Sequence, residues 1–93
     1  MYIVIRKYRT NSPEEVMQKI KAGFLPLISR APGFIDYYAF QNGTDTIVIV
    51  NMFDTEIAGK NSTEIAKQWV DDNIAHLYAG PPEIMQGEAG VAQ

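Results

Sequence analysis

The sequence predicts an α+β fold of the ferredoxin-like class, with the element order βαββαβ and an antiparallel sheet. Three observations predict it. A helix-start signal, Ser12-Pro13-Glu14-Glu15, follows a β-branched first segment. Asn42-Gly43, a strong hairpin signal, separates two β-branched and aromatic runs. A second helical pattern ends at Gly80-Pro81-Pro82. A chain of 93 residues is short enough to be predicted as one domain, residues 1–93.

Composition limits the class of protein. Hydrophobic residues make up 46% of the chain and charged residues 20%, which is typical of soluble globular domains and excludes a disordered or fibrous chain. The absence of cysteine excludes disulfides and a cysteine nucleophile, and it favours a reducing compartment. In residues 1–7 the apolar side chains precede the basic ones, the reverse of a secretion signal, and no apolar run is long enough to cross a membrane. We therefore expect a cytoplasmic protein that makes no membrane contact.

The charge distribution argues against nucleic-acid binding. The formal net charge is −3, and the basic residues are dispersed over the first strand and helix without a clustered stripe. Binding to a phosphate backbone favours a concentrated basic surface. Nucleic acid is therefore not an expected partner.

Residues 2–9 are predicted to form the first strand, because they are β-branched, aromatic or long-chain basic. The first helix is predicted to begin at Pro13, because Ser12 can cap it and Glu15 completes a capping box. Pro26 is expected to kink or end this helix. Spacings of three and four residues place one apolar face of the helix in the core: Val16, Met17, Ile20, Phe24 and Leu27 or Ile28.

Residues 34–41 and 46–53 are predicted to pair as an antiparallel hairpin. Both alternating sets of residues on 46–53 are largely apolar, whereas a sheet with one wet face should show polar residues on that face. The sets are Ile47, Ile49, Asn51 and Phe53, and Thr46, Val48, Val50 and Met52. Two short helices can cover only one face, so we predict a homodimer through sheet-to-sheet packing. The alternative is shielding by long side chains from neighbouring strands.

The second helix is predicted to begin with Asn61 or Ser62 as its N-cap and to run to about Tyr78. A last strand is predicted over residues 83–91, although two glycines interrupt it.

Polar residues fall within the apolar half of the second helix. At roughly 100° per residue, that half contains these apolar side chains: Ile65, Ala66, Trp69, Val70, Ile74 and Leu77. Asn73 lies one turn after Trp69, and His76 two turns after it. A buried amide without a partner costs about 1–3 kcal/mol, so Asn73 either bonds to the backbone or a loop, or faces a cavity. Trp69, Asn73 and His76 are candidate catalytic residues. The alternative is structural: Trp69 in the core and His76 at the helix C-terminus.

Three other residues are candidates for substrate binding. Asn51 interrupts an apolar strand face, and Tyr2 and Tyr38 supply phenols on strands that could reach a cavity beneath the second helix. None has a diagnostic spacing. With one histidine and no clustered carboxylates, a metal site is not predicted, and no glycine-rich loop is placed to bind phosphate.

Several segments share a pattern with a known family. They are Ala31-Pro32-Gly33-Phe34, Trp69-Val70-Asp71-Asp72-Asn73-Ile74-Ala75, Gly80-Pro81-Pro82-Glu83-Ile84 and Gly87-Glu88. In this order, the chain resembles the antibiotic biosynthesis monooxygenase domain family over nearly its whole length. The resemblance implies a dimeric α+β barrel, which agrees with the two apolar sides of residues 46–53.

Some members of that family are cofactor-free oxygenases that convert polycyclic phenols or quinols to quinones, and others degrade haem. The oxygenases have an asparagine one turn before the tryptophan, where this chain has Ile65, so the resemblance carries over only Trp69. The haem-degrading members separate their tryptophan and histidine more widely than Trp69 and His76. They also use an asparagine on the first strand, where this chain has Arg6 or Lys7. The resemblance therefore disfavours haem degradation.

The resulting hypothesis is a cofactor-independent monooxygenase. It would oxidise a small or polycyclic aromatic quinol or phenol with O2 in a pocket between the second helix and the sheet, using no cofactor or metal. Trp69 and Asn73 would position the substrate, and His76 or a tyrosine would accept or relay its proton. The alternative is a non-enzymatic dimer of the same fold that binds a small ligand or has a stress-related role. An isomerase or lyase is a third class.

Overall fold

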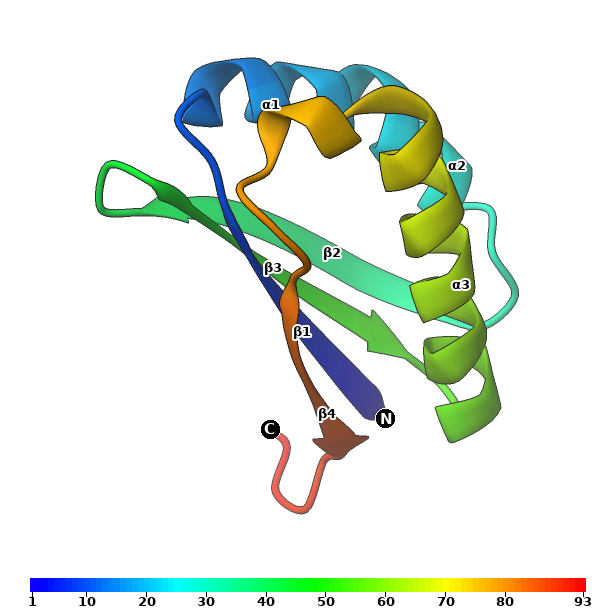
Figure 1. Cartoon of the computed structure of the whole chain (residues 1–93). Coiled ribbons are helices and arrows are strands. Elements are labelled where there is room, and N and C mark those ends of the chain that lie inside the picture. The colour runs from blue at the N-terminus through cyan, green and yellow to red at the C-terminus, as the bar shows by residue number, and fades with distance from the viewer.

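A computed structural model describes residues 1–93 and contains one four-stranded antiparallel sheet with helices on one face (Figure 1). The strands lie in the order β2-β3-β1-β4. The elements in chain order are β1 (Tyr2–Arg9), α1 (Pro13–Lys19), a π-helical turn (Ile20–Phe24), α2 (Leu25–Ile28), β2 (Phe34–Asn42), β3 (Thr46–Phe53), α3 (Glu56–Asn73), a 3-10 turn (Ala75–Leu77) and β4 (Glu83–Glu88). The predicted ferredoxin-like α+β class and the element order are confirmed.

The first helical segment reaches Ile28 without ending at Pro26. Its middle turn is π-helical, and the Leu25 N–H donates to the Ile20 carbonyl, five residues back. Pro26 then lies in the first turn of α2, where a missing N–H breaks no helical hydrogen bond. The expected irregularity therefore takes the form of a widened turn just before the proline.

The second helix begins earlier and ends earlier than predicted. Thr55 is its N-cap, and the Thr55 hydroxyl accepts a hydrogen bond of 3.2 Å from the Ala58 N–H. Asn61 and Ser62, the predicted caps, lie inside α3. The α-helix ends at Asn73 and not near Tyr78. The last strand is also shorter than predicted, because β4 ends at Glu88.

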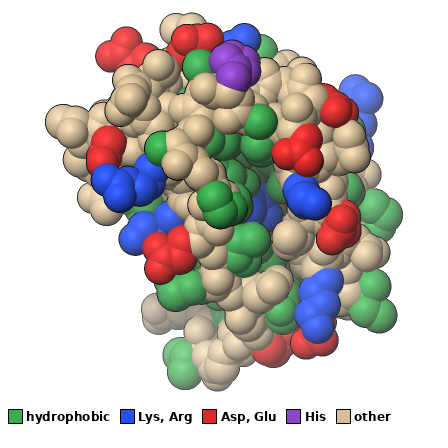
Figure 2. Space-filling view, in the orientation of Figure 1, with side chains coloured by type: hydrophobic (Ala, Val, Ile, Leu, Met, Phe, Trp, Pro, Cys, Tyr) green, Lys and Arg blue, Asp and Glu red, His purple; other side chains and the backbone are tan.

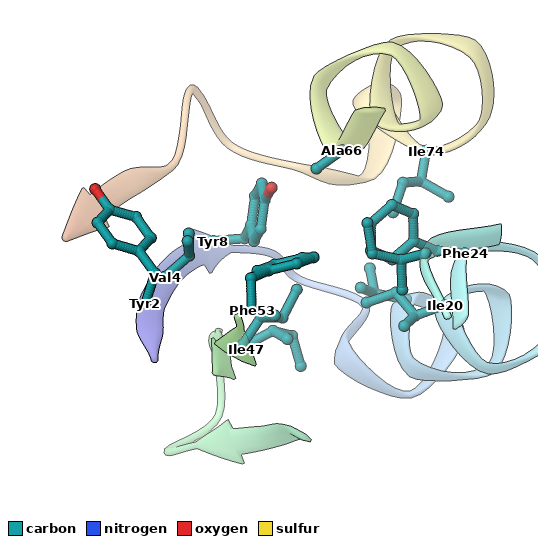
Figure 3. Close-up of a cluster of buried hydrophobic side chains, with 12 residues drawn as sticks. Tyr2, Val4, Tyr8, Ile20, Phe24, Ile47, Phe53, Ala66 and Ile74 are labelled. Carbon is teal, nitrogen blue, oxygen red and sulfur yellow. The ribbon is translucent and has the colours of Figure 1, made fainter. Parts of the chain in front are cut away.

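The core lies between the helices and one face of the sheet. From β1, alternate side chains beginning with Tyr2 and Val4 point to this face and are buried, and Phe53 from β3 lies opposite Tyr2. Figure 3 shows Phe53 and Ile47 from β3 facing Phe24 and Ile20 from the first helical segment, with Ala66 from α3 and Ile74 just after it.

The opposite face of the sheet carries no helix (Figure 1). The strand register places on it an apolar surface, here called the open face, whose members are partly or largely exposed. They are Ile3, Ile5, Tyr38, Phe40, Val50, Met52 and Met85. The exposed fractions of Tyr38, Phe40 and Met85 are 56%, 49% and 57%. Separately, none of the helices is long and apolar enough to cross a membrane.

Candidate functional site

A buried arginine marks the candidate site. Arg6 points from the middle of β1 toward the helices, and only 1% of it is exposed. It lines an inner void of about 10 Å³, whose other walls are almost entirely apolar or aromatic. The lining residues are Arg6, Tyr8, Ile20, Phe24, Ile49, Ala66, Trp69, Val70 and Tyr78. All three guanidinium nitrogens, Nε, Nη1 and Nη2, are buried without a hydrogen-bond partner of normal geometry.

An unpaired buried charge is energetically unfavourable. Guanidinium groups remain protonated at any physiological pH, so Arg6 cannot escape the penalty by losing its charge. Removing such a charge from water costs several kcal/mol unless an opposite charge and hydrogen-bond acceptors replace the water. No acidic residue lines the void. The arrangement is therefore suited to accept a ligand that carries an acceptor oxygen.

Three phenols surround Arg6. Burial raises the pKa of Tyr8, Tyr37 and Tyr78 above the ordinary 10.0, and the positive charge of Arg6 opposes this rise without cancelling it. The hydroxyls of Tyr37 and Tyr78 are buried and have no hydrogen-bond partner. These phenols are therefore protonated at neutral pH and can donate hydrogen bonds to a ligand.

Asn51 adds an unsatisfied amide to the same side of the sheet. It is fully buried on β3, opposite Val4 of β1 and Tyr37 of β2. Neither its Oδ1 nor its Nδ2 has a hydrogen-bond partner. Because native structures satisfy most buried polar groups, this concentration of unpaired polar atoms beneath the helices indicates a binding site.

A larger cleft lies outside the inner void. Its volume is about 440 Å³, and it is lined by α3, the segment after the 3-10 turn and the start of β4. Figure 2 looks into this hollow, which hydrophobic side chains line between α3 and the segment leading to β4. Tyr8 and Tyr78 line both spaces and stack with ring centroids 4.3 Å apart. The stacked pair therefore forms part of the wall between the cleft and the void.

The structure brings two of the sequence-predicted residues to this region. Trp69 lines the inner void and packs against Phe24 with ring centroids 5.4 Å apart. Its indole also lies over Gly23 of the π-helical turn, where a Cβ would come within 2.9 Å of Trp69 Cζ2. Asn51 is the second, as described above. Both therefore lie on the helix side of the sheet, near Arg6 or its tyrosines.

The other predicted site residues lie elsewhere. Asn73 and His76 are exposed, so the expectation that both face the sheet is wrong. The Asn73 amide donates a 2.8 Å hydrogen bond to the Trp69 carbonyl at the end of α3. Figure 2 shows His76, the only histidine, on the surface. Tyr38 lies on the open face, and Tyr2 is buried in the core against Gly59, outside the void and the cleft.

Sequence reasoning did not select Arg6 as a site residue. The signal that could have identified it is alternation: Tyr2, Val4, Arg6 and Tyr8 share one face of the first strand. A cation in the centre of an otherwise apolar and aromatic strand face is placed where burial is expected.

Comparison with protein-family models found no match, and neither did comparison with curated proteins. Comparison with solved structures found clear matches. A monooxygenase from the gene ActVA-Orf6 of Streptomyces coelicolor, in complex with nanaomycin D, has a TM-score of 0.82 at 13% identity; the match covers 99% of this chain and 89% of that chain. NE2512, a protein of unknown function from Nitrosomonas europaea, has a TM-score of 0.77 at 23% identity, covering 99% and 90%.

SnoaB, a cofactor-independent oxygenase from Streptomyces nogalater that was solved as a point mutant, has a TM-score of 0.77 at 11% identity, covering 98% and 94%. Identities at this level establish the fold and leave the activity open. The chain has the fold of the antibiotic biosynthesis monooxygenases.

Proposed function

We propose that this protein is a cofactor-independent monooxygenase that oxidises a small or polycyclic aromatic phenol or quinol with O2 in the pocket between α3 and the sheet. The observation that carries the proposal is the cleft of about 440 Å³, which is separated by the Tyr8 and Tyr78 rings from an inner void with unpartnered polar groups around it. A pocket of this size suits a small aromatic molecule, and a few polar groups at its end can fix the orientation of that molecule. Structural neighbours described as a monooxygenase and as a cofactor-independent oxygenase support the choice of reaction.

The reaction balances without an external reductant. A phenol with a free ring position, or the methylene of an anthrone, gives four electrons to O2. One oxygen atom becomes the new quinone carbonyl, and the other leaves as water with the two displaced hydrogens. The electron-rich form of such a substrate is its deprotonated form, which reacts with O2 more readily than the neutral molecule. The protein then has to bind that form, orient it and exclude water.

Named residues have distinct parts in the proposal. Tyr8 and Tyr78 line the cleft and offer aromatic walls against which a ring can pack, and Trp69 and Phe24 line the inner void beyond them. Arg6 faces the substrate oxygen. Tyr37 and Asn51 have unpaired polar atoms on the sheet side but line neither the void nor the cleft, so they do not touch the substrate directly. Asn73, His76, Tyr38 and Tyr2 have no part in it, because their side chains lie outside the void and the cleft.

Oxygen consumption tests the proposal. Purified protein, treated with a chelator, is given a panel of anthrones and naphthols, and O2 uptake is followed with an electrode while quinone formation is followed by absorbance. We expect one O2 consumed per quinone formed, without added flavin or metal. A panel that gives no uptake above the protein-free rate would contradict the proposal.

A non-enzymatic ligand-binding protein is the second candidate. The favouring observation is that no carboxylate or imidazole lines the inner void and that the phenols around Arg6 stay protonated at neutral pH, so the void offers no group that removes a proton from a substrate. A binding protein needs no such group. A rise in melting temperature with a phenol that is recovered unchanged under air would favour this candidate.

We further propose that two copies pair through the open face. Large exposed side chains gather there: Tyr38, Phe40 and Met85. A contiguous apolar surface of this kind is unfavourable in water, and a second copy of the same surface would cover it around a twofold axis. Analytical ultracentrifugation at micromolar concentration tests this proposal, and a monomeric mass would contradict it.

A further inference from the structure

We infer that the site selects its ligand as an anion, with one ionised oxygen of the ligand in the inner void against Arg6. The inference deepens the proposed function and rests on the same pocket. It assigns Arg6 as the residue that sets the charge state of the substrate. It also assigns the source of the negative charge, which is the ligand itself and not a side chain.

No negative charge of the protein balances the positive charge of Arg6. The elements packed against it contribute phenols, an amide and apolar groups, and none contributes a carboxylate. These groups are Tyr8 from β1, Tyr37 from β2, Asn51 and Ile49 from β3, Ile20 and Phe24 from the π-helical turn, Ala66, Trp69 and Val70 from α3, and Tyr78 from the segment before β4. The charged side chains of the cleft wall, Lys67 and Asp71, belong to exposed residues of α3 and do not line the void. The buried positive charge is therefore left for a ligand to neutralise.

The void and the cleft differ greatly in volume. A space of about 10 Å³ corresponds to roughly one water-sized sphere, so it admits one oxygen atom and no ring. The cleft of about 440 Å³ has room for the ring itself. A phenolate or enolate matches this division, because its negative oxygen is a single atom attached to a larger planar body.

The stacked tyrosines separate the cleft from the void. Tyr8 and Tyr78 stand between the two spaces. Tyr78 lies between the 3-10 turn and β4, two residues before Gly80, and its backbone forms an isolated β-bridge with Thr10. Gly80 has a φ of 152°, which other residues rarely adopt. A small displacement of Tyr78 would join the cleft to the void, so that the ligand oxygen reaches Arg6 while its ring packs on Tyr8.

The inner void also contains no acceptor for a proton. The phenols beside Arg6 are protonated at neutral pH and act as donors. The ligand oxygen therefore loses its proton outside the void, before or during entry. Arg6 favours this release by stabilising the anion, which lowers the pKa of the bound ligand.

A chromogenic phenol tests the inference. Para-nitrophenol is used because its anion absorbs visible light and its neutral form does not. Protein is titrated into the probe at a pH below the pKa of the free probe. We expect the anion band to appear on binding, with the pKa of the bound probe lowered by at least about one unit, which is a tenfold preference for the anion.

Matched variants isolate the role of Arg6. Arg6→Met should bind the anion at least about tenfold more weakly and lose the anion band. Arg6→Lys should recover part of it. Arg6→Gln removes the charge while keeping a polar side chain, and it serves as the second variant if Arg6→Met does not fold. Arg9→Met, on the same strand but exposed on the other face, should behave as the original protein.

Para-nitroanisole cannot ionise and reports the apolar cleft alone. It should bind equally to the original protein and to Arg6→Met. The inference is overturned if the bound nitrophenol stays neutral, if Arg6→Met binds its anion as well as the original protein does, or if no nitrophenol binds at millimolar concentration.

These outcomes are separate from the fate of the monooxygenase proposal. Anion binding without O2 uptake from any phenol would leave this inference standing and contradict the oxygenase. O2 uptake that Arg6→Met retains in full would support the oxygenase and contradict this inference.

Discussion

At the residue scale, Arg6 has opposite effects on two quantities: it lowers the stability of the ligand-free protein and strengthens the proposed anion binding. Its charge is buried without a partner, which destabilises the folded protein when no ligand is present. Methionine fills a similar volume without a charge. We predict that Arg6→Met leaves the free energy of unfolding unchanged or raises it, by up to about 4 kcal/mol, while anion binding is lost.

Thermal unfolding of the ligand-free proteins measures this prediction. Arg9→Met is the matched control, because the Arg9 side chain is 76% exposed and pairs only with Asp45 at the surface. Surface ion pairs contribute about 0–1 kcal/mol, so the control should change little. A marked fall in the melting temperature of Arg6→Met would show that the guanidinium stabilises the free protein.

The three buried tyrosines predict a loss of stability at alkaline pH. Burial raises the pKa of Tyr8, Tyr37 and Tyr78 above 10.0 in the folded state. Above pH 10 the unfolded chain therefore binds fewer protons than the folded chain, and the free energy of unfolding falls as pH rises. Below pH 10 these three groups are protonated in both states, so they contribute nothing to the dependence of stability on pH.

Melting temperatures measured from pH 8 to about pH 11 check this dependence. Tyr37→Phe, which cannot ionise at that position, should give a shallower decline. An equal slope in the variant and the original protein would show that Tyr37 ionises at the same pH in both states.

Residue patterns predicted the position of some candidate residues. Trp69 and Asn51, which were selected as site candidates, lie on the helix side of the sheet, and their roles as site residues stay a prediction. The orientation of Asn73 and His76 was not predictable from helical spacing. The α-helix ends at Asn73, and Ile74 has a φ of −134°, so His76 no longer follows the helical phase that the spacing assumed.

At the scale of elements, the start of α3 depends on one side-chain hydrogen bond. The Thr55 hydroxyl accepts from the Ala58 N–H at 3.2 Å. We predict that Thr55→Ala lowers the free energy of unfolding by about 1 kcal/mol, the usual effect of losing an N-cap. Asn61→Ala is the control, because Asn61 is exposed inside the helix, where alanine is the better helix former.

Chemical denaturation of both variants distinguishes the two possible helix starts. Asn61→Ala should be neutral or slightly stabilising. If it were the variant that loses stability, the helix would begin where the sequence pattern suggested and not at Thr55.

The error in that boundary has a physical cause. Thr55, Asn61 and Ser62 are all residue types that favour N-caps, so the local pattern offers more than one start. Ser62 satisfies its hydroxyl by donating to the Gly59 carbonyl within the helix, which makes an interior position possible. The hairpin carried no such ambiguity, because Asn42-Gly43 is flanked by two apolar runs of similar length, and β2 and β3 pair as expected.

At the scale of the whole molecule, the open face predicts an effect of charge on assembly. We expect Phe40→Glu to dissociate the proposed dimer, because a carboxylate buried between two sheets without a partner costs several kcal/mol. Ile57→Glu is the matched control. It replaces an apolar side chain that is 74% exposed on α3, away from the open face.

Sedimentation velocity measures the mass in solution of the original protein and the two variants. The original protein and Ile57→Glu should share the mass of a dimer, and Phe40→Glu should have that of a monomer. A dimer that survives Phe40→Glu would move the interface to another surface.

The topology of the whole chain was predictable, because each connection carries its own local signal and the elements alternate in a known order. The cavity was not. Its walls come from β1, the π-helical turn, α3 and the segment before β4, which only the packed structure brings together. A residue pattern describes one helix or strand at a time, so a void shared by several elements has no sequence signature.

The uncompensated charge of Arg6 also bears on how long the protein survives in a cell. A ligand that binds only the folded form shifts the folding equilibrium in proportion to its concentration. Degradation acts mainly on unfolded molecules, so a chain whose empty form is destabilised is removed faster. We expect the steady-state amount of this protein to rise with the supply of its ligand, and that of an Arg6→Met variant to be independent of it.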